Sequence, residues 1–178
     1  MKSLWTEDST TINGEFQQLE KTILAPKPLQ QPHPPVIFGG QSVGALRRTA
    51  RHGDGYMGAG PTTTQDFAAH VQTLRTALAD IGRDEATMPI SKRVFMYVDD
   101  DADKAKQILD HWFSNRYPWM IKLNPNFVAD VSVWGPPEQC AAGLRAVQAA
   151  GAATIVLNPI QDFVAQFERL TDDVIPYL

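Results

Sequence analysis

Two neighbouring stretches between residues 36 and 60 decide the fold. The first, Val36-Ile37-Phe38-Gly39-Gly40-Gln41-Ser42, is a short apolar run that ends in two glycines, with a serine in the N-cap position of a helix reaching about His52. The second, Asp54-Gly55-Tyr56-Met57-Gly58-Ala59-Gly60, is another strand punctuated by glycines, and the proline and threonines after it favour a helix start. Each stretch therefore predicts a strand, a glycine turn and a helix in that order.

The helix after the second stretch carries an apolar stripe. Its large apolar residues are three or four positions apart, which places them on one face of a helix that Gly82 can end. The stripe consists of Phe67, Val71, Leu74, Leu78 and Ile81.

Two more strands follow, each with its helix. Residues 89–98 predict a third strand, and the Asp run 99–101 places negative charge before a helix that reaches Trp112 or Phe113. Residues 153–157 predict a fourth strand, preceded by a helix with an apolar side. Residues 114–133 show no regular pattern, which favours a lid or a partner surface. The last helix is expected to carry an apolar stripe of Phe163, Phe167, Leu170 and Val174.

Four strand-then-helix units predict an α/β fold with about four parallel strands and helices on the outer face of the sheet. A (β/α)8 barrel needs eight strands to close, and an open sheet of four leaves two unpaired edges. The chain therefore looks like half of a larger structure. We expect a single domain over residues 1–178, in which residues 36–178 form the four units.

Residues 1–35 predict a helix end, a hairpin and a proline-rich strap. Asn13-Gly14 provides residues that tolerate the positive φ of a tight hairpin turn within residues 11–24. The eleven residues 25–35 include five prolines, which remove backbone donors and hold the chain extended. We expect this segment to be an outer strap.

The composition excludes several classes of protein. With 178 residues, 43% hydrophobic and 20% charged, the chain resembles an ordinary soluble domain. The net charge is −4 and no basic run exceeds Arg47-Arg48, which argues against nucleic-acid or membrane-surface binding. No apolar run reaches the ~20 residues of a membrane span. Without a signal peptide, and with the single Cys140 unable to form an internal disulfide, a cytoplasmic location is expected.

The ordered motifs of the chain resemble those of the luciferase-like monooxygenase family. The resemblance lies in residues 36–42, in the Ala45-Leu46-Arg47-Arg48 segment, and in the Gly53-Asp54-Gly55-Tyr56 segment, all in the same order and spacing as in that family. Residues 4–8, the hairpin around Asn13-Gly14, the strap and the closing Thr154–Pro159 segment fit as well. The similarity implies an enzyme on a (β/α)8 barrel, of which this chain corresponds to the C-terminal half.

The resemblance also implies a cofactor and a place for it. The family binds FMN or the deazaflavin coenzyme F-420 for hydride transfer or monooxygenation of small molecules. The matching positions for its phosphate are Gly39, Gly40, Gln41 and Ser42 after one strand, and Gly58, Ala59 and Gly60 after the next. Glycine turns and helix N-termini bind phosphate through backbone N–H groups. The catalytic residues stay unknown, because the first four strands of the barrel have no counterpart here.

Other candidate residues have simpler explanations. The Asp run 99–101 suits a helix dipole better than a metal, and the four histidines show no metal-binding spacing, so we expect no metal site. Cys140 fits a small buried hydrophobe. Arg47, Arg48 and Arg51 follow the first turn and are expected to be solvated. A ligand contact by Asn158, after the last strand, stays open.

Three functional readings remain open at this point. The first is a half-barrel oxidoreductase that acts as a homodimer or with a complementing N-terminal half-barrel chain. The second is a noncatalytic half-barrel without cofactor that self-associates through its open edges. The third is a small flavodoxin-like domain, which would have helices on both faces of its sheet.

Overall fold

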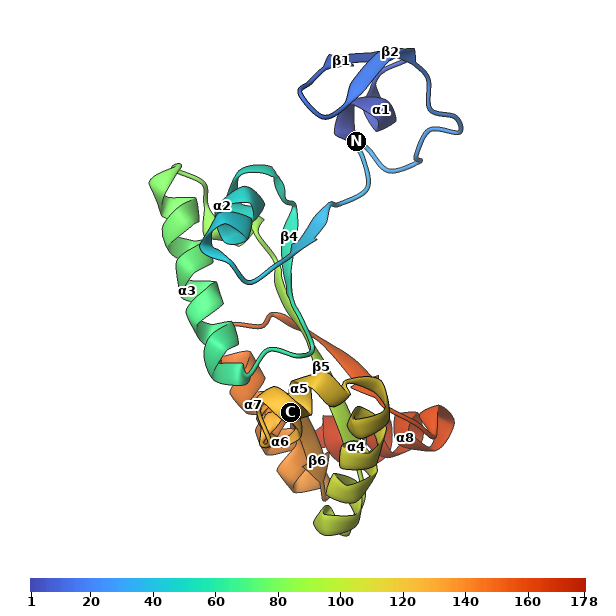
Figure 1. Cartoon of the computed structure of the whole chain (residues 1–178), viewed down its shortest axis with the longest axis vertical. Helices are drawn as coiled ribbons and strands as arrows, with labels where there is room; N and C mark the ends of the chain where they lie inside the picture. Colours follow the sequence, from blue (N-terminus) through green and yellow to red (C-terminus); the bar gives the residue numbers. More distant parts are fainter. The chain divides into compact units, whose positions relative to one another are not determined.

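The computed structural model describes all of residues 1–178 and consists of two compact units, Met1–Val36 and Ile37–Leu178 (Figure 1). The first unit corresponds closely to the predicted hairpin and strap, and the second to the predicted strand and helix units. Assignment of the whole chain to one domain stays a prediction.

The first unit contains one short helix and one hairpin. Helix α1 covers Lys2–Thr6, and the antiparallel strands β1 (Thr10–Asn13) and β2 (Gln18–Thr22) form the hairpin. The prediction of a positive-φ turn at Asn13-Gly14 is wrong. Asn13 pairs with Gln18, and Gly14 N–H donates to the Gln17 carbonyl at 3.0 Å, so a four-residue loop replaces the two-residue turn. The positive φ lies at Lys21 instead, where the strand register shifts.

The proline-rich segment is a loop with bends at residues 25–26 and 29–32, so the prediction that prolines hold all of it extended is wrong. Residues 25–35 form no helix or strand. The Lys27 ammonium donates to the Leu4 carbonyl at 2.8 Å and also to the Glu7 carbonyl, and the Trp5 ring lies 6.0 Å from His33. These contacts fasten the segment to the end of α1.

The second unit is a parallel sheet with helices. Its strands are β3 (Ile37–Gly39), β4 (Gly55–Gly58), β5 (Ile90–Val98), β6 (Ser132–Gly135) and β7 (Thr154–Pro159). Its helices are α2 (Val43–His52), α3 (Thr64–Asp80), α4 (Ala102–Arg116), α5 (Pro118–Leu123), α6 (Phe127–Val131), α7 (Pro137–Ala149) and α8 (Phe163–Arg169). Short 3-10 turns cover Glu85–Thr87 and Ile175–Tyr177, and one π-helical turn covers Leu170–Val174. None of these helices combines the length and the hydrophobicity that a membrane-spanning helix needs.

Strand β5 organises the sheet. Its first residues pair with β4, its last residues pair with β6, and its middle pairs with β7. Ser91 pairs with both β4 and β7, and Phe95 with both β6 and β7, so β4 and β6 share one edge of β5. Strand β3 adds to β4, which gives the order β3-β4-β5-β7 with parallel pairing throughout. The outer edges of β3 and β7 have no strand beside them.

Four of these strands confirm the four predicted ones, whereas β6 was missed. The segment 114–133, expected to be irregular, contains the end of α4, the short helices α5 and α6, and the first residues of β6. Each element is too short for its periodicity to stand out. Strand β6 forms because β4 ends opposite Lys92, which leaves Phe95–Val98 without a neighbour on that edge until Ser132–Gly135 fills it.

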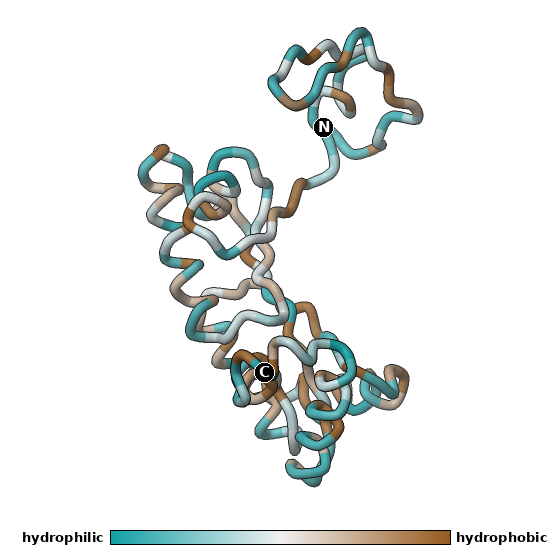
Figure 2. Tube along the Cα trace, viewed as in Figure 1, coloured by the Kyte–Doolittle hydropathy of each residue, from teal (hydrophilic) through white to brown (hydrophobic).

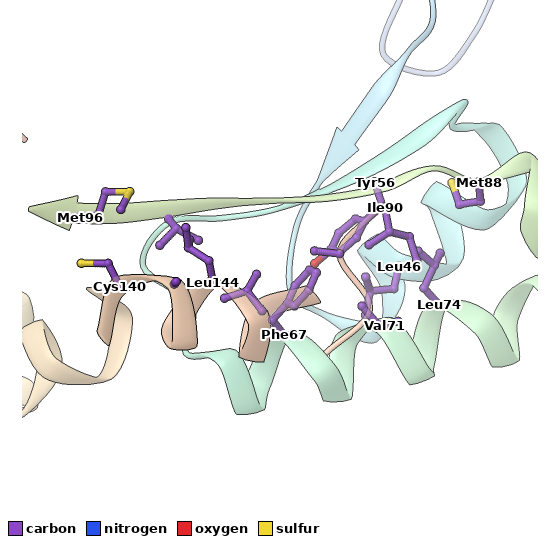
Figure 3. Packing of buried hydrophobic residues seen from close by; sticks show 14 of the residues in the cluster. Leu46, Tyr56, Phe67, Val71, Leu74, Met88, Ile90, Met96, Cys140 and Leu144 are labelled. Atoms are coloured by element: carbon purple, nitrogen blue, oxygen red, sulfur yellow. The ribbon is translucent and has the colours of Figure 1, made fainter. Parts of the chain in front are cut away.

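The main core lies between the sheet and helices α2, α3 and α7. Figure 3 shows the α3 side chains Phe67, Val71 and Leu74 directed toward the strands, with Tyr56 beside Phe67 and with Cys140 near Met96. The predicted α3 stripe is confirmed for four of its members, but Ile81 at the helix end is 45% exposed. In Figure 2, the helices alternate between hydrophilic and hydrophobic colour along their turns.

A second cluster occupies the other face of the sheet at the carboxyl end of β5. Phe95 and Tyr97 alternate along β5 with core residues Val94 and Met96, so they project to the opposite face. There they pack against residues of α4 and α6. The buried helical members are Ala105, Leu109, Phe113, Phe127, Val128 and Val131. Helices α4 and α6 therefore cover part of this face as well, whereas helices on only one face were predicted, because the large apolar side chains of Phe95 and Tyr97 need their own cover.

The predicted stripe of the last helix is half wrong. Leu170 and Val174 are buried, but Phe163 and Phe167 are 65% and 68% exposed. The π-helical turn from Leu170 changes the residue repeat, so the two halves of the stripe do not share a face. Gln166 is buried in their place, where its amide donates to the Val98 carbonyl and accepts from Val98 N–H.

Candidate functional site

The structure brings the two predicted glycine turns together. Gly39 pairs with Met57, so β3 and β4 end side by side and both turns leave the same edge of the sheet. The Gln41 side-chain amide donates to the Thr62 hydroxyl at 2.6 Å and so connects the turns directly. Residues 39–42 and 58–62 therefore form one continuous feature, which we call the double turn.

The first turn depends on Gly40. Its φ is +132°, a conformation that side-chain-bearing residues rarely adopt, and a Cβ there would lie 2.7 Å from the Ala45 Cβ. The Tyr56 hydroxyl donates to the Gly40 carbonyl at 3.1 Å, and burial raises the pKa of Tyr56, which keeps that proton in place. The carbonyl of Gly40 is thus held toward the core.

The N-terminus of α2 provides free donors beside this turn. Ser42 is the N-cap, as predicted, and its hydroxyl accepts from Ala45 N–H. The N–H groups of Val43 and Gly44 have no acceptor within the chain, and a Cβ built on Gly44 meets nothing within 4 Å. Exposed N–H groups at the positive end of a helix dipole favour a bound anion.

The second turn is more enclosed. Gly58 and Gly60 are buried and Ala59 is half-buried. A Cβ on Gly58 would lie 2.5 Å from the Phe67 ring, and one on Gly60 would lie 2.5 Å from the Phe95 ring. Thr62 N–H donates to the Ala59 carbonyl at 3.2 Å, and Thr63 caps α3 by accepting from Asp66 N–H. Close packing fixes this turn from both faces of the sheet.

A buried lysine under the second turn is a functional candidate that the sequence analysis missed. Lys92 is 2% exposed, and its ammonium donates to the carbonyls of Ala59 at 2.5 Å and Arg93 at 3.0 Å, with Gly60 at 3.4 Å. Burial, and secondarily the charge of Arg93, lower the pKa of Lys92 to about 8. The sequence does contain a sign of it, because Lys92 alternates with the apolar positions 90, 94, 96 and 98 of the same strand.

The other sequence candidates have structural roles. Asp101 caps α4, Asp99 pairs with Lys104 at 2.6 Å, and Asp100 pairs with Arg169 at 2.6 Å. No group of three or more His, Cys, Asp or Glu side chains is arranged to hold a metal. Cys140 is fully buried, as predicted, and burial raises the pKa of its thiol to about 12.

Arg47, Arg48 and Arg51 are exposed on α2, also as expected. Asn158, the open case, is half-buried on β7 and pairs in register with Phe95. Together with Arg93 it lines a cavity of about 270 Å³.

Comparison with known proteins identifies the family. A model of the luciferase-like monooxygenase family matches residues 1–154. The chain belongs to the luciferase-like monooxygenase family. Among curated relatives, the FMNH2-dependent dimethylsulfone monooxygenase of Pseudomonas putida is 23% identical over 99% of this chain and 55% of its own length. Pyrimidine monooxygenase RutA of Methylorubrum populi is 34% identical over 59% of this chain and 27% of its own length.

Solved structures of other oxidoreductases share the fold. An F-420-dependent secondary alcohol dehydrogenase superposes with a TM-score of 0.81 at 20% identity, over 99% of this chain and 58% of that one. The oxygenating constituent of 3,6-diketocamphane monooxygenase, solved with FMN, gives 0.70 at 14% identity, over 99% and 60%. The chain thus spans little more than half of these proteins. The agreement confirms the predicted fold class. Helices α4 and α6 cover part of the second face of the sheet, the feature expected of a flavodoxin-like domain, but the superposition over 99% of the chain favours the half-barrel.

Proposed function

We propose that the chain is the C-terminal half-barrel of a luciferase-like oxidoreductase or monooxygenase, and that the double turn holds the phosphate of FMN or coenzyme F-420. The observation that carries the proposal is the junction of the two turns at neighbouring strand ends, connected by the bond from Gln41 to Thr62. Family membership and the cofactors named for its relatives support it.

The residues present fit a phosphate. The free N–H groups of Val43 and Gly44 and the hydroxyl proton of Ser42 are donors, and no acidic side chain lies in the first turn of α2. Gly40 lets the backbone approach closely where a Cβ would meet Ala45. The second turn contributes backbone fixed in position by Lys92.

The chemistry would come from the cofactor, and the double turn would position it. A bound flavin or deazaflavin supplies the ring that exchanges a hydride with a small-molecule substrate. Fixing the phosphate at the double turn would restrict how the cofactor can move, and holding a reactant in place lowers the entropic part of a barrier. A cytoplasmic location and a small-molecule substrate belong to the same proposal.

Gly44 offers the sharpest test of the phosphate site. Gly44→Asp places a carboxylate among the free N–H groups. The helix dipole stabilises a carboxylate at this position, but the carboxylate repels a phosphate. Gly44→Asn has nearly the same shape without the charge. In flavin fluorescence titrations we expect the Asp variant to bind FMN or F-420 at least about tenfold more weakly than the Asn variant. Equal affinities of the two variants for the cofactor would show that its phosphate does not bind at the first turn.

A second candidate function follows from the sheet edges. The outer edges of β3 and β7 carry no neighbouring strand, and Ile37 and Val156 on them are 48% and 38% exposed. Such edges pair with other strands. A homodimer, or a complex with an N-terminal half-barrel chain, would cover them, with or without a cofactor. Light scattering after size exclusion, with absorbance recorded across the peak, separates the cases: a dimer with flavin supports the enzyme, and a colourless dimer supports a noncatalytic assembly.

A further inference from the structure

A cavity beside the double turn is lined by two arginines that have no hydrogen-bond or ion-pair partner. It measures about 270 Å³ and lies between the middle of β5, the carboxyl end of β7 and the end of α4, where Arg93 and Arg116 both line it. Neither guanidinium forms a hydrogen bond or an ion pair with any residue of the chain. No aspartate or glutamate lines the cavity. Two positive charges therefore face one space without a counter-charge.

Aromatic rings bring the two guanidiniums together. Arg93 lies over the Phe95 ring with its Cζ 5.0 Å from the centroid, and Arg116 lies over Trp112 at 5.3 Å. The Phe95 and Trp112 rings are themselves 5.7 Å apart. Because each arginine stacks on one member of this pair, both charges lie at one aromatic floor, with Arg93 half-buried and Arg116 still exposed to solvent. Tyr117 packs 6.5 Å from Phe95 and completes the floor.

The position of Arg93 is built into the fold. Arg93 alternates along β5 with core residues, so it projects to the face opposite the main core. A Cβ on Gly60 would lie 2.9 Å from the Arg93 Nε, so glycine at this point of the second turn leaves the room that the arginine uses. The cavity thus adjoins the double turn through direct packing.

We propose that this cavity binds the carboxylate of a small aromatic molecule, with Arg93 and Arg116 on the carboxylate and the ring on the aromatic floor. A guanidinium fork matches a carboxylate in geometry as well as charge. A cavity of about 270 Å³ is about nine times the ~30 Å³ that one water occupies in the liquid, so it has room for a molecule the size of benzoate and not only for an inorganic ion. Asn158 adds an amide that can donate to the same group.

An aromatic carboxylate at this place would be the substrate class of the proposed enzyme. That role rests on the proposed function, because it requires a cofactor at the double turn, whereas binding of the anion requires only the cavity. The two claims are therefore tested separately: one by benzoate and the other by FMN.

The test is isothermal titration calorimetry of the full chain with benzoate and with benzamide, its neutral counterpart. Benzoate is expected to bind about 10- to 100-fold more tightly, and the difference should shrink as salt is raised. Arg93→Met and Arg116→Met should each weaken benzoate binding about tenfold or more, whereas Lys122→Met, an exposed cation on α5 outside the cavity, should leave it unchanged.

The outcomes separate the claims. Three results would each overturn the proposal: equal affinity for benzoate and benzamide, no benzoate binding, or unchanged benzoate binding in the arginine variants. The comparison of benzoate with benzamide uses the unaltered chain, so it does not depend on the folding of any variant. Displacement of benzoate by FMN in direct competition would also overturn it, because the cavity would then be part of the cofactor site. Benzoate binding without FMN binding would support the cavity and count against the proposed function alone.

Discussion

The two halves of the double turn differ in exposure and in what holds them. The first turn, residues 39–42, is largely exposed and has free helix N–H groups beside a glycine in a rare conformation. The second, residues 58–62, has buried glycines packed against Phe67 and Phe95 and a lysine beneath it. The comparison shows that the free N–H donors and the tightly packed backbone lie in different turns, which the hydrogen bond from Gln41 to Thr62 connects.

Among these predictions, changing the charge of Lys92 under the second turn should have the largest effect on the free energy of unfolding. The folded-state pKa of about 8 lies below the ordinary 10.5, so between these values the unfolded chain binds more protons than the folded one. The free energy of unfolding should therefore rise with pH from about 8 to 10.5, by up to about 3 kcal/mol from this group. Denaturant titrations of the wild type and of Lys92→Met over this range measure it.

The Lys92→Met variant isolates this contribution. It retains every other titrating group, so the difference between the two proteins should favour the wild type increasingly as the pH rises. If the unfolding free energies of the two proteins changed with pH in parallel, the Lys92 ammonium would have an ordinary pKa. Its hydrogen bonds to the carbonyls of Ala59 and Arg93 would then offset the effect of burial.

Gly40→Ala tests the conformation of the first turn. Placing a Cβ at φ +132° and 2.7 Å from the Ala45 Cβ should lower the free energy of unfolding by about 2 to 3 kcal/mol. Thermal unfolding followed by circular dichroism measures the loss. Because Gly40 adjoins the free N–H groups, FMN affinity should fall as well. A variant as stable as the wild type would show that the turn relaxes to another conformation.

Gly58→Ala tests the packing of the second turn. Its Cβ would lie 2.5 Å from the buried Phe67 ring, and such overpacking should cost about 2 kcal/mol. Gly44→Ala is the matched control, because a Cβ there meets nothing within 4 Å and alanine favours a helix, with an expected gain of about 1 kcal/mol. If both substitutions changed stability equally in chemical denaturation, the contrast between a packed and an open turn would be lost.

The sequence predicted the first turn better than the second. Glycines, a capping serine and an apolar strand are local signals, so β3, the Ser42 cap and α2 follow from neighbouring residues. The role of Lys92 depends on residues 59 and 60, more than thirty positions away, and no local pattern reveals that contact. The hydrogen bond from Gln41 to Thr62 was not predicted for the same reason.

The same distinction explains the errors elsewhere. Strand β6 has four residues and exists because β4 is too short to cover the edge of β5, which is a property of the assembled sheet. Phe163 and Phe167 were expected on the buried stripe, but a π-helical turn changed the repeat after them. Periodicity predicts long regular elements such as α3, and it fails where the repeat changes.

The bond between the turns gives the smallest and most specific effect. The variants Gln41→Leu and Thr62→Val each remove one partner of the 2.6 Å hydrogen bond, and the double variant removes both. In a double-mutant cycle on unfolding free energy, the coupling should be about 1 kcal/mol. The same cycle measured on FMN affinity tests whether the second turn helps the first turn to bind the cofactor. A coupling in stability together with independent effects on FMN affinity would show that the two turns share structure but act separately on the cofactor.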